Sequence, residues 1–327
     1  MVALARVQHA TPQPAADPQF AADVLAGLKA TPKRIPAKYF YDSEGSRLFE
    51  EITALPEYYP TRCEMKILRE QGGEIAGLIP EGAALIELGS GSTKKVRILL
   101  KHAPKLAVYV PVDISAEFLR REAAELRRNR PELPVVPVVA DFCKPFGLPE
   151  MARTASARVG LFPGSTIGNF EPHEAADFLR NIGKILGTGA TLIVGVDLIK
   201  PPEILNAAYN DKQGVTADFN FNLLTRINRE LGAHFKPEFF EHHAFYNRER
   251  NRIEMHLASL KRQKVRVGGE TVDFRAGETI HTENSYKYSV DSLNALASGV
   301  GWTPLQVWTD PDKYFAVAAF RFAAPAA

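Results

Sequence analysis

The stretch LIELGSGSTKK at 85–95 is the first candidate for chemistry, because an acidic residue, a glycine pair and two lysines follow an apolar run. A glycine turn after a strand brings backbone amides close to a ligand. The spacing does not match the P-loop pattern G-x-x-x-x-G-K-[ST]. A dinucleotide fingerprint needs a third glycine where this chain has Lys94. The turn therefore favours a ligand without phosphates, and a purely structural turn is the alternative.

Acidic residues also close the next two apolar runs. Asp113 stands where a carboxylate can accept both ribose hydroxyls. Asp141 can accept an exocyclic amine, and Phe142 beside it can pack against a purine. These positions fall at the carboxyl ends of parallel strands, where open α/β sheets bind ligands. Together with the acidic-x-Gly-x-Gly turn at Glu87 and Gly89, they favour S-adenosylmethionine as the cofactor.

The elements that position these residues alternate between short apolar runs and helical patterns. The apolar runs lie at 84–88, 107–113, 134–141, 159–165 and 190–197. Helices are predicted between them at 94–102, 115–129, 147–153 and 171–186. This order predicts a parallel sheet covered on both faces by helices. A helix at 290–298 and two final strands close it, so we expect an α/β, Rossmann-like class I methyltransferase sheet.

The pattern changes after Asp197. Two helices are predicted, the second with apolar residues at helical spacing, and residues 238–289 then read as strands divided by Gly-rich turns. These segments predict a second, discontinuous α+β substrate-binding domain, formed by residues 1–60 and 198–288. The S-adenosylmethionine-binding domain is then formed by residues 61–197 and 289–327.

Charge and cysteine content restrict the class of protein. The chain has 40 Lys+Arg against 38 Asp+Glu, so we expect no nucleic-acid or membrane surface. Its two cysteines, Cys63 and Cys143, lie far apart, and we expect neither a secretory signal nor a membrane-spanning run. We therefore expect a cytoplasmic monomer that acts on a small molecule. His242, His243 and His256 lack the spacing of a metal site, so no metal is predicted.

Several longer motifs resemble one known family, and the resemblance extends from about residue 20 to the end of the chain. These motifs are AKYFYDSEGSRLFEEITALPEYYPTRCEMKIL (37–68), GSGSTKK, FPGSTIGNF, AYND, FNFNLLTRINRELGAHF and TENSYKY. They are similar to the histidine-specific Nα-methyltransferases of ergothioneine biosynthesis. The resemblance implies successive methyl transfers from S-adenosylmethionine to the α-amine of L-histidine, which give hercynine.

The resemblance also implies roles for residues that match the family's motifs. Those implied to contact the cofactor are Tyr58, Gly89, Lys95, Asp113, Asp141 and Phe142. Those implied to bind the substrate are Tyr41, Phe49, Asn169, Tyr209, Met255, Glu283 and Ser285. Asn169 and Tyr209 match positions that hold the amine and carboxylate of the substrate. Tyr41 and Phe49 match aromatics at the amine end, and Tyr41 joins Asn169 and Tyr209 as a catalytic residue.

The imidazole pocket implied by the resemblance consists of Met255, Glu283 and Ser285. Residues two apart on a strand face the same side, so Glu283 and Ser285 are expected to point together. The alternative is a solvated strand face, which His281 and Lys287 would share. An ionised Glu only accepts hydrogen bonds, whereas a Ser hydroxyl both donates and accepts. The pair therefore suits the two nitrogens of a neutral imidazole.

Other interpretations of these residues remain open. Tyr58 and Met255 are also typical of a hydrophobic core, and Asn169 also suits a helix cap near Pro172. On function, the alternatives are methylation of another amino acid such as tryptophan, a nicotinamide oxidoreductase, and a non-catalytic protein that binds S-adenosylmethionine. The expected catalysis is positioning, with the amine held near ~3 Å from the methyl group and in line with the leaving sulfur.

Overall fold

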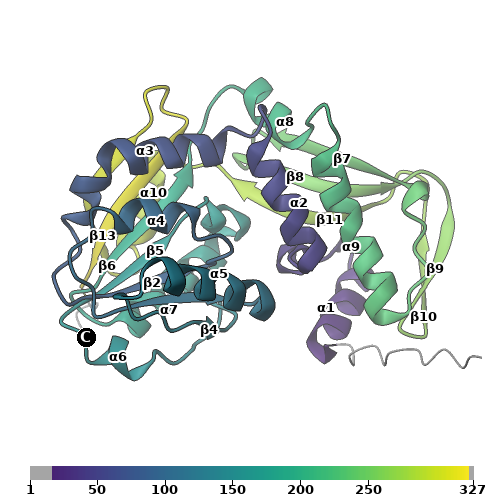
Figure 1. Ribbon diagram of the computed structural model, residues 1–327. Helices are drawn as coiled ribbons and strands as arrows, with labels where there is room; N and C mark the ends of the chain where they lie inside the picture. The colour runs from purple at the N-terminus through teal and green to yellow at the C-terminus, as the bar shows by residue number, and fades with distance from the viewer. Residues whose placement is uncertain (1–16, 324–327) are drawn as a thin grey trace, which may run out of the picture.

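The computed structural model describes residues 17–323, so the ends of the predicted domains at 1–16 and 324–327 lie outside the described residues. The larger sheet has seven strands in the order β12-β13-β6-β5-β2-β3-β4 (Figure 1). Its strands are β2 (Ala84–Leu88), β3 (Val108–Asp113), β4 (Val138–Val139), β5 (Arg158–Phe162), β6 (Thr191–Asp197), β12 (Trp302–Thr309) and β13 (Phe315–Phe322). Strands β2 to β6 are parallel, and β13 pairs antiparallel with β6 and β12. This arrangement confirms the predicted Rossmann-like class I methyltransferase fold.

Helices cover both faces of this sheet. On one face lie α3 (Tyr59–Ala76), α4 (Lys94–Leu100) and α5 (Ala116–Asn129). On the other lie α6 (Glu150–Arg153), α7 (Pro172–Leu186) and α10 (Val290–Ser298). All five residues of β2 are buried, with Ala84 and Ile86 in one core and Leu85 in the other. Strands buried on both faces explain why the sequence shows continuous apolar runs there.

Two predicted elements are shorter than expected. The third strand, predicted at 134–141, pairs only at Val138–Val139 and through an isolated bridge from Val135 to Tyr109. Pro134 and Pro137 interrupt it, because proline has no backbone N–H to donate to a neighbouring strand. The helix predicted at 147–153 is the single turn α6.

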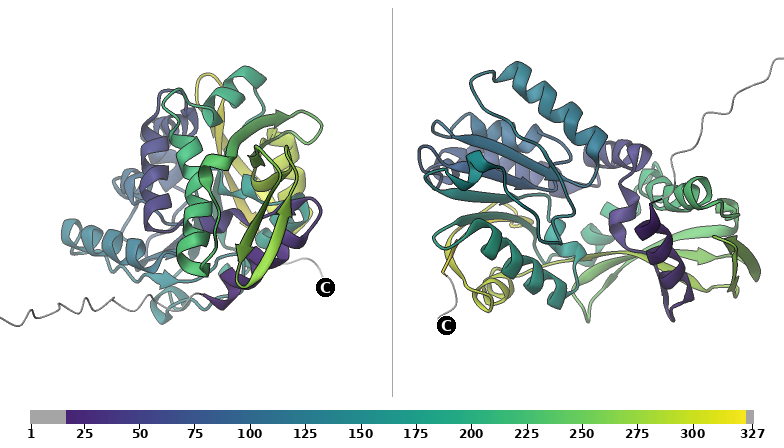
Figure 2. Two further views of the ribbon diagram at one scale, coloured as in Figure 1. Left: turned by 90° about the vertical axis from the view of Figure 1, so that its right-hand side faces the viewer. Right: turned by 90° about the horizontal axis from the view of Figure 1, so that it is seen from below.

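The smaller sheet has four strands in the order β1-β11-β8-β7, and a hairpin of β9 and β10 extends beyond it (Figure 1). The strands are β1 (Lys33–Arg34), β7 (Phe240–Asn247), β8 (Arg252–Ser259), β9 (Gln263–Val267), β10 (Glu270–Phe274) and β11 (Thr279–Tyr286). The helices beside it are α1 (Pro18–Lys29), α2 (Ser43–Ala54), α8 (Pro202–Tyr209) and α9 (Val215–Leu231). Three short 3-10 turns are η1 (Ala37–Phe40), η2 (Thr166–Asn169) and η3 (Pro237–Phe239). Figure 2 shows α9 running along this sheet, next to the hairpin.

A register shift in β11 decides which side chains share a face of the smaller sheet. It lies between His281 and Glu283, so that His281 pairs with His256 whereas Glu283 pairs with Met255. Paired residues point to the same face and neighbours along β8 to opposite faces. The expectation that His281 and Glu283 share a face is therefore wrong. We call the face of Met255, Glu283 and Ser285 the inner face, and the face of His256 and His281 the outer face.

The hydrophobic cores support the predicted division into two domains, which remains a proposal. One core joins α1, α2, α8 and α9 to the smaller sheet and the hairpin. The other two cores lie on the two faces of the larger sheet. The predicted boundary at residue 60 falls inside the first turn of α3, which begins at Tyr59. Within the described residues, no helix is both long and apolar enough to cross a membrane.

Candidate active site

The glycine turn after β2 has the conformation that its sequence predicts. Gly89 has φ +70°, a region that residues with a side chain seldom adopt. The amides of Gly89 and Ser90 both donate to the carbonyl of Val112 in β3, at 2.9 and 3.1 Å. A Cβ at Gly89 would lie 3.4 Å from the Phe142 ring, so the turn approaches this ring closely. The turn thus brings the backbone close to an aromatic ring at the end of β2.

A buried carboxylate supports this turn from inside the sheet. Glu87 is 1% exposed, and its Oε2 accepts hydrogen bonds from the hydroxyls of Ser90 (3.0 Å) and Tyr109. Burial raises the pKa of Glu87 to about 7, although both hydrogen bonds act in the opposite direction. Glu87 therefore shapes the turn through Ser90.

Asp113 and Asp141 lie where the sequence placed them, at the ends of neighbouring segments of the larger sheet. Asp113 closes β3, and its Oδ1 accepts the amide of Ser115 at 2.8 Å. Asp141 Oδ1 accepts the amide of Cys143 at 3.0 Å. Burial raises the pKa of Asp113. Each carboxylate is thus oriented by its own loop, while Phe142 packs edge-on against Phe162 with ring centroids 5.6 Å apart.

Lys95 belongs to an ion pair that joins α4 to α3 beside the larger sheet. Its Nζ lies 2.6 Å from Glu64 Oε2, and the Glu64 side chain is 2% exposed. Both carboxylate oxygens of Glu64 also accept the amide of Gly164 at 2.9 Å. A Cβ at Gly195 in β6 would lie 2.1 Å from Glu64 Oε1, so only glycine leaves room for this carboxylate. The sequence analysis missed Glu64, because an acid in an amphipathic helix normally indicates a solvated face.

A cavity between α2, α8, α9 and the smaller sheet brings together most of the predicted substrate residues. It is lined by Phe49, Ile52, Tyr58, Ala208, Tyr209, Thr216, Phe219, Met255 and Glu283. Met255 and Tyr58 therefore belong both to the core and to the cavity wall. Of the other predicted substrate residues, Tyr41 packs edge-on against Phe49 at 5.6 Å, and Ser285 bonds to Tyr209. Asn169 lies outside this lining, at the end of η2.

Aromatic rings form a continuous wall around the cavity. Phe49 packs edge-on against Tyr58 at 6.2 Å between centroids, and Tyr58 packs edge-on against Tyr209 at 6.4 Å. Phe219 lies 6.1 Å from Phe49 and 5.8 Å from Tyr41, which adds a ring that the sequence analysis assigned only to a helix core. The pKa values of Tyr41, Tyr58 and Tyr209 lie well above the usual value. Burial is the main cause, and nearby acidic and phenolic groups add to it. The wall is therefore neutral and rich in π electrons, which suits a cation.

Glu283 and Ser285 point to the inner face, where Ser285 is buried and Glu283 is partly exposed. Glu283 lines the cavity, and burial raises its pKa to about 7 against the opposing effect of Lys287. Ser285 is 4% exposed, and its Oγ lies 2.8 Å from the hydroxyl of Tyr209. Lys287, which a solvated face would expose, is 3% exposed. The solvated-face alternative is therefore wrong.

A buried ionic network lies behind Ser285 and begins at the end of β6. Asp197 Oδ2 accepts from the Tyr59 hydroxyl at 2.7 Å and lies 2.8 Å from Lys287 Nζ. Its Oδ1 lies 2.5 Å from Lys200 Nζ. Burial alone would raise the pKa of Asp197, but Lys287 and Lys200 outweigh it and hold the pKa below its usual value. This network ties the larger sheet to the smaller sheet.

Asn169 is not the cap of α7. Glu171 is the N-cap residue and forms a capping box with Glu174, so the helix-cap alternative for Asn169 is wrong. The turn η2 instead lies against β11, because a Cβ at Gly168 would be 2.8 Å from the carbonyl oxygen of Tyr286. Asn169 thus stands where the loop after β5 meets the smaller sheet.

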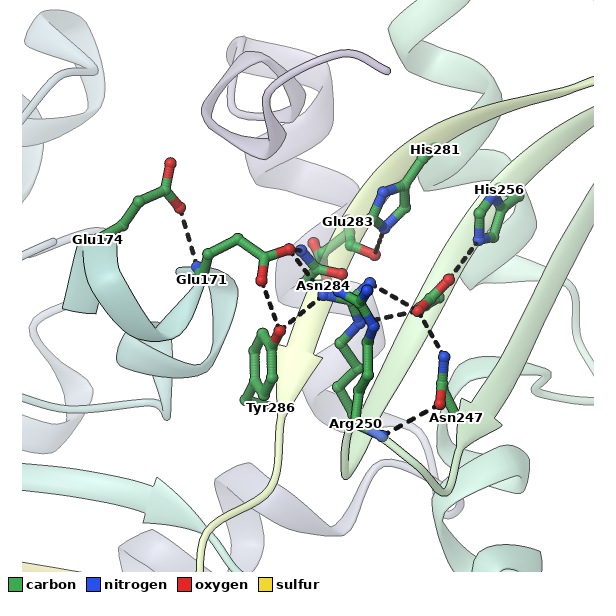
Figure 3. A network of polar contacts seen from close by, with 11 residues as sticks. Glu171, Glu174, Asn247, Arg250, His256, His281, Glu283, Asn284 and Tyr286 are labelled. Atoms are coloured by element: carbon green, nitrogen blue, oxygen red, sulfur yellow. Dashed lines mark hydrogen bonds and ion pairs between the residues drawn. The ribbon is translucent and has the colours of Figure 1, made fainter. Parts of the chain in front are cut away.

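The outer face carries a second polar network (Figure 3). Glu171 accepts from Arg252 at 2.7 Å, Tyr286 at 2.6 Å and Asn284 at 3.1 Å. Arg252, whose side chain is 6% exposed, also lies 2.7 Å from Glu254. The start of α7 is thus fixed to β8 and β11.

The described residues contain one group whose atoms could reach a metal ion, on this outer face. Glu254, His256 and His281 each offer a ligand atom within 4.8 Å of the others. Glu254 already accepts hydrogen bonds from Arg252 at 2.8 Å, Asn247 at 3.0 Å and His256 at 3.0 Å. Burial, then His281, lowers the pKa of His256 to about 4. These contacts explain the cluster as a polar network, and the absence of a metal stays a prediction.

Comparison with known proteins relates the chain to one family. The family described as "Histidine-specific methyltransferase, SAM-dependent" matches residues 20–322. The histidine N-alpha-methyltransferase of Mycobacterium tuberculosis (strain CDC 1551 / Oshkosh) is 43% identical over 293 residues, which cover 88% of this chain and 90% of that protein. The protein of the same name from Mycolicibacterium smegmatis is 43% identical over 296 residues, with coverage of 88% and 90%. Ergothioneine biosynthesis protein 1 of Neurospora crassa is 33% identical over 300 residues, which cover 88% of this chain and 33% of that protein.

Proposed function

This chain belongs to the S-adenosylmethionine-dependent histidine-specific methyltransferases, and we propose that it trimethylates the α-amine of L-histidine. The product is hercynine, and the reaction is the first step of ergothioneine biosynthesis. The observation that carries the assignment is a carboxylate, Glu283, that faces a cavity walled by aromatic rings. The lining suits a small ring with an N–H group next to an amine that becomes a cation, and the cavity, about 20 Å³ in this structure, must widen to admit them.

The cofactor half of the proposed site is the edge of the larger sheet. S-adenosylmethionine supplies the methyl group from a sulfonium. Gly89 lets the chain approach the adenosine, and Asp113 accepts the ribose hydroxyls. Asp141 and Phe142 bind the adenine, while Tyr58 faces the cofactor from the cavity and Lys95 contacts it from the first turn of α4. The positive φ of Gly89 and its 3.4 Å approach to Phe142 support this fit.

The substrate half lies on the inner face of the smaller sheet. Asn169 and Tyr209 hold the amine and carboxylate, and Tyr41 and Phe49 surround the amine. Met255, Glu283 and Ser285 bind the imidazole. The chain's own contribution is placement of the amine near ~3 Å from the methyl group, with the lone pair in line. No protein base is needed, because the ammonium formed loses its proton to water.

The partners and location form a second part of the proposal. We propose that the chain acts as a monomer in the cytoplasm, without a nucleic-acid or membrane partner. The near-equal numbers of basic and acidic residues, 40 and 38, support this. Size-exclusion chromatography with light scattering measures the oligomeric state, and a dimer mass would refute the first point.

Mass spectrometry of the purified protein with S-adenosylmethionine and each amino acid separately tests the reaction. We expect histidine to gain methyl groups until the trimethylated product accumulates. Methylation of tryptophan but not histidine would favour the alternative amino-acid substrate. Binding of S-adenosylmethionine without turnover of any amino acid would favour a non-catalytic protein.

A further inference from the structure

Lys287 lies behind the proposed imidazole pocket, and its ammonium group is fully enclosed. Its side chain is 0% exposed. An ammonium has three N–H donors, and Lys287 Nζ has three partners. These are Asp197 Oδ2 at 2.8 Å, Ser285 Oγ at 2.8 Å and the Tyr209 hydroxyl at 3.4 Å. The geometry therefore leaves this lysine no rotational freedom and directs one N–H at Ser285.

The contacts of Lys287 and Tyr209 determine which hydrogen bonds the Ser285 hydroxyl can still form with a ligand. Ser285 Oγ accepts from Lys287 and also from the Tyr209 hydroxyl at 2.8 Å. A hydroxyl oxygen accepts through two lone pairs and donates through one O–H. Both lone pairs of Ser285 are thus occupied. Its remaining capacity is to donate, so it presents an O–H to the pocket.

We infer that Lys287 is a positioning residue that makes Ser285 a fixed donor and thereby selects a neutral imidazole in one tautomer. The inference rests on the proposed function, because it assumes that the ring lies between Glu283 and Ser285. Ionised Glu283 can only accept, so it takes the ring N–H. Ser285 can only donate, so it faces the ring nitrogen that carries a lone pair.

This arrangement rejects other rings without any steric barrier. An imidazolium has N–H groups on both nitrogens, so one of them would face the Ser285 O–H. A ring with a C–H group in place of the lone-pair nitrogen would leave that O–H buried without a partner, which is costly. Lys287 therefore contributes to specificity although it need not touch the substrate.

The test compares Lys287→Met with Lys200→Met. Both lysines pair with Asp197, but Lys200 bonds to Tyr59 and has no hydrogen bond to Ser285 among the described residues. The substrates are histidine and two pyrrolylalanines, which keep one ring N–H and replace the other nitrogen by C–H. We expect Lys287→Met to lower kcat/KM for histidine about tenfold and to lower the preference for histidine over the pyrroles about tenfold. Lys200→Met should preserve that preference, and both variants should bind S-adenosylmethionine as the parent does.

The results distinguish a failure of the inference about Lys287 from a failure of the proposed function. Equal preference ratios in both lysine variants would mean that Lys287 only neutralises Asp197, which overturns the inference. A parent protein that does not methylate histidine would refute the proposed function instead. If Lys287→Met fails to fold, Ser285→Ala retains the ion pair between Lys287 and Asp197. Ser285→Ala must also lose the preference for histidine, and a preserved preference would overturn the inference.

Discussion

The two halves of the site differ in how the chain supports their charged groups. On the cofactor side, Asp113 and Asp141 stand at strand ends, and each is oriented by an amide of its own loop. On the substrate side, Lys287 and Asp197 are buried, and each is the other's partner although they lie far apart in the sequence. A buried charge is costly unless it is paired. The pair of Lys287 and Asp197 is thus expected to tolerate the loss of a partner less well than Asp113 or Asp141.

The largest expected effect comes from removing the arginine of the outer face. Arg252→Met leaves Glu254 and Glu171 without their cation, and Arg252 is 6% exposed. Breaking a buried ion pair in this way should lower the free energy of unfolding by about 3 kcal/mol. Urea denaturation measures the loss. The control is Arg180→Met, whose exposed pair with Asp177 should contribute little. If the two variants are equally stable, the buried ion pairs of Arg252 contribute no more to stability than the exposed pair of Arg180 and Asp177.

The next effect concerns the cofactor half alone. Asp113→Ala removes the proposed acceptor of the ribose hydroxyls and should weaken binding of S-adenosylmethionine by about 1.5–3 kcal/mol. Stability should change less than in Arg252→Met, because Asp113 bonds only to its own loop. Calorimetric titration checks the affinity, with the exposed Asp291→Ala as the control. An unchanged affinity in the folded Asp113 variant would place the ribose elsewhere.

The third prediction concerns how activity depends on pH through the titration of Glu283. Burial raises its pKa to about 7, so the carboxylate loses its charge as pH falls through 7. The ionised form accepts the ring N–H more strongly than the neutral carboxyl, because that hydrogen bond is charge-assisted, so kcat/KM for histidine should fall over that range. Glu283→Gln should cost about 1.5 kcal/mol at pH 8 and should lose this inflection. The titration of histidine itself near pH ~6.5 should remain in both proteins. Identical pH profiles would show that Glu283 does not bind the ring.

The smallest effect is expected at the aromatic wall. Phe49→Leu keeps an apolar surface but removes a ring near the proposed amine position, so the later methylation steps lose about 0.5–1 kcal/mol of cation–π stabilisation. Dimethylhistidine should then accumulate in time courses followed by mass spectrometry. Phe245→Leu is the control, because Phe245 lies on the outer face and stacks on His256. The same product pattern in both variants would argue against a role of the wall in the last transfer.

The sequence predicts the position of the strand ends in the proposed cofactor half for a physical reason. The ends of parallel strands meet at one edge of a sheet, so Gly89, Asp113 and Asp141 come together once the strand order is known. The turn residue also follows from backbone conformation, since Gly89 has φ +70°. The third strand was overestimated because apolar composition predicts burial, whereas Pro134 and Pro137 limit hydrogen bonding.

The substrate half depends on features that periodicity cannot show. A register shift in β11 turns His281 and Glu283 to opposite faces, and strict alternation predicts the reverse. Lys287 looks solvated in sequence, because its burial depends on Asp197 almost a hundred residues earlier. Phe219 follows the helical spacing of a core residue and also lines the cavity. The family resemblance supplied Tyr41, Phe49 and Met255, whose spacing alone indicates only core.

The close approach of Glu64 to Gly195 limits which substitutions are tolerated at position 195. Even an alanine there would place its Cβ 2.1 Å from Glu64 Oε1, so the Glu64 carboxylate would have to move away from Lys95 and Gly164. Loss of Glu64 would in turn leave Lys95 without its carboxylate and the amide of Gly164 without its acceptor. Gly195, Glu64 and Lys95 are therefore expected to be inherited as one unit, although they come from a strand and two separate helices.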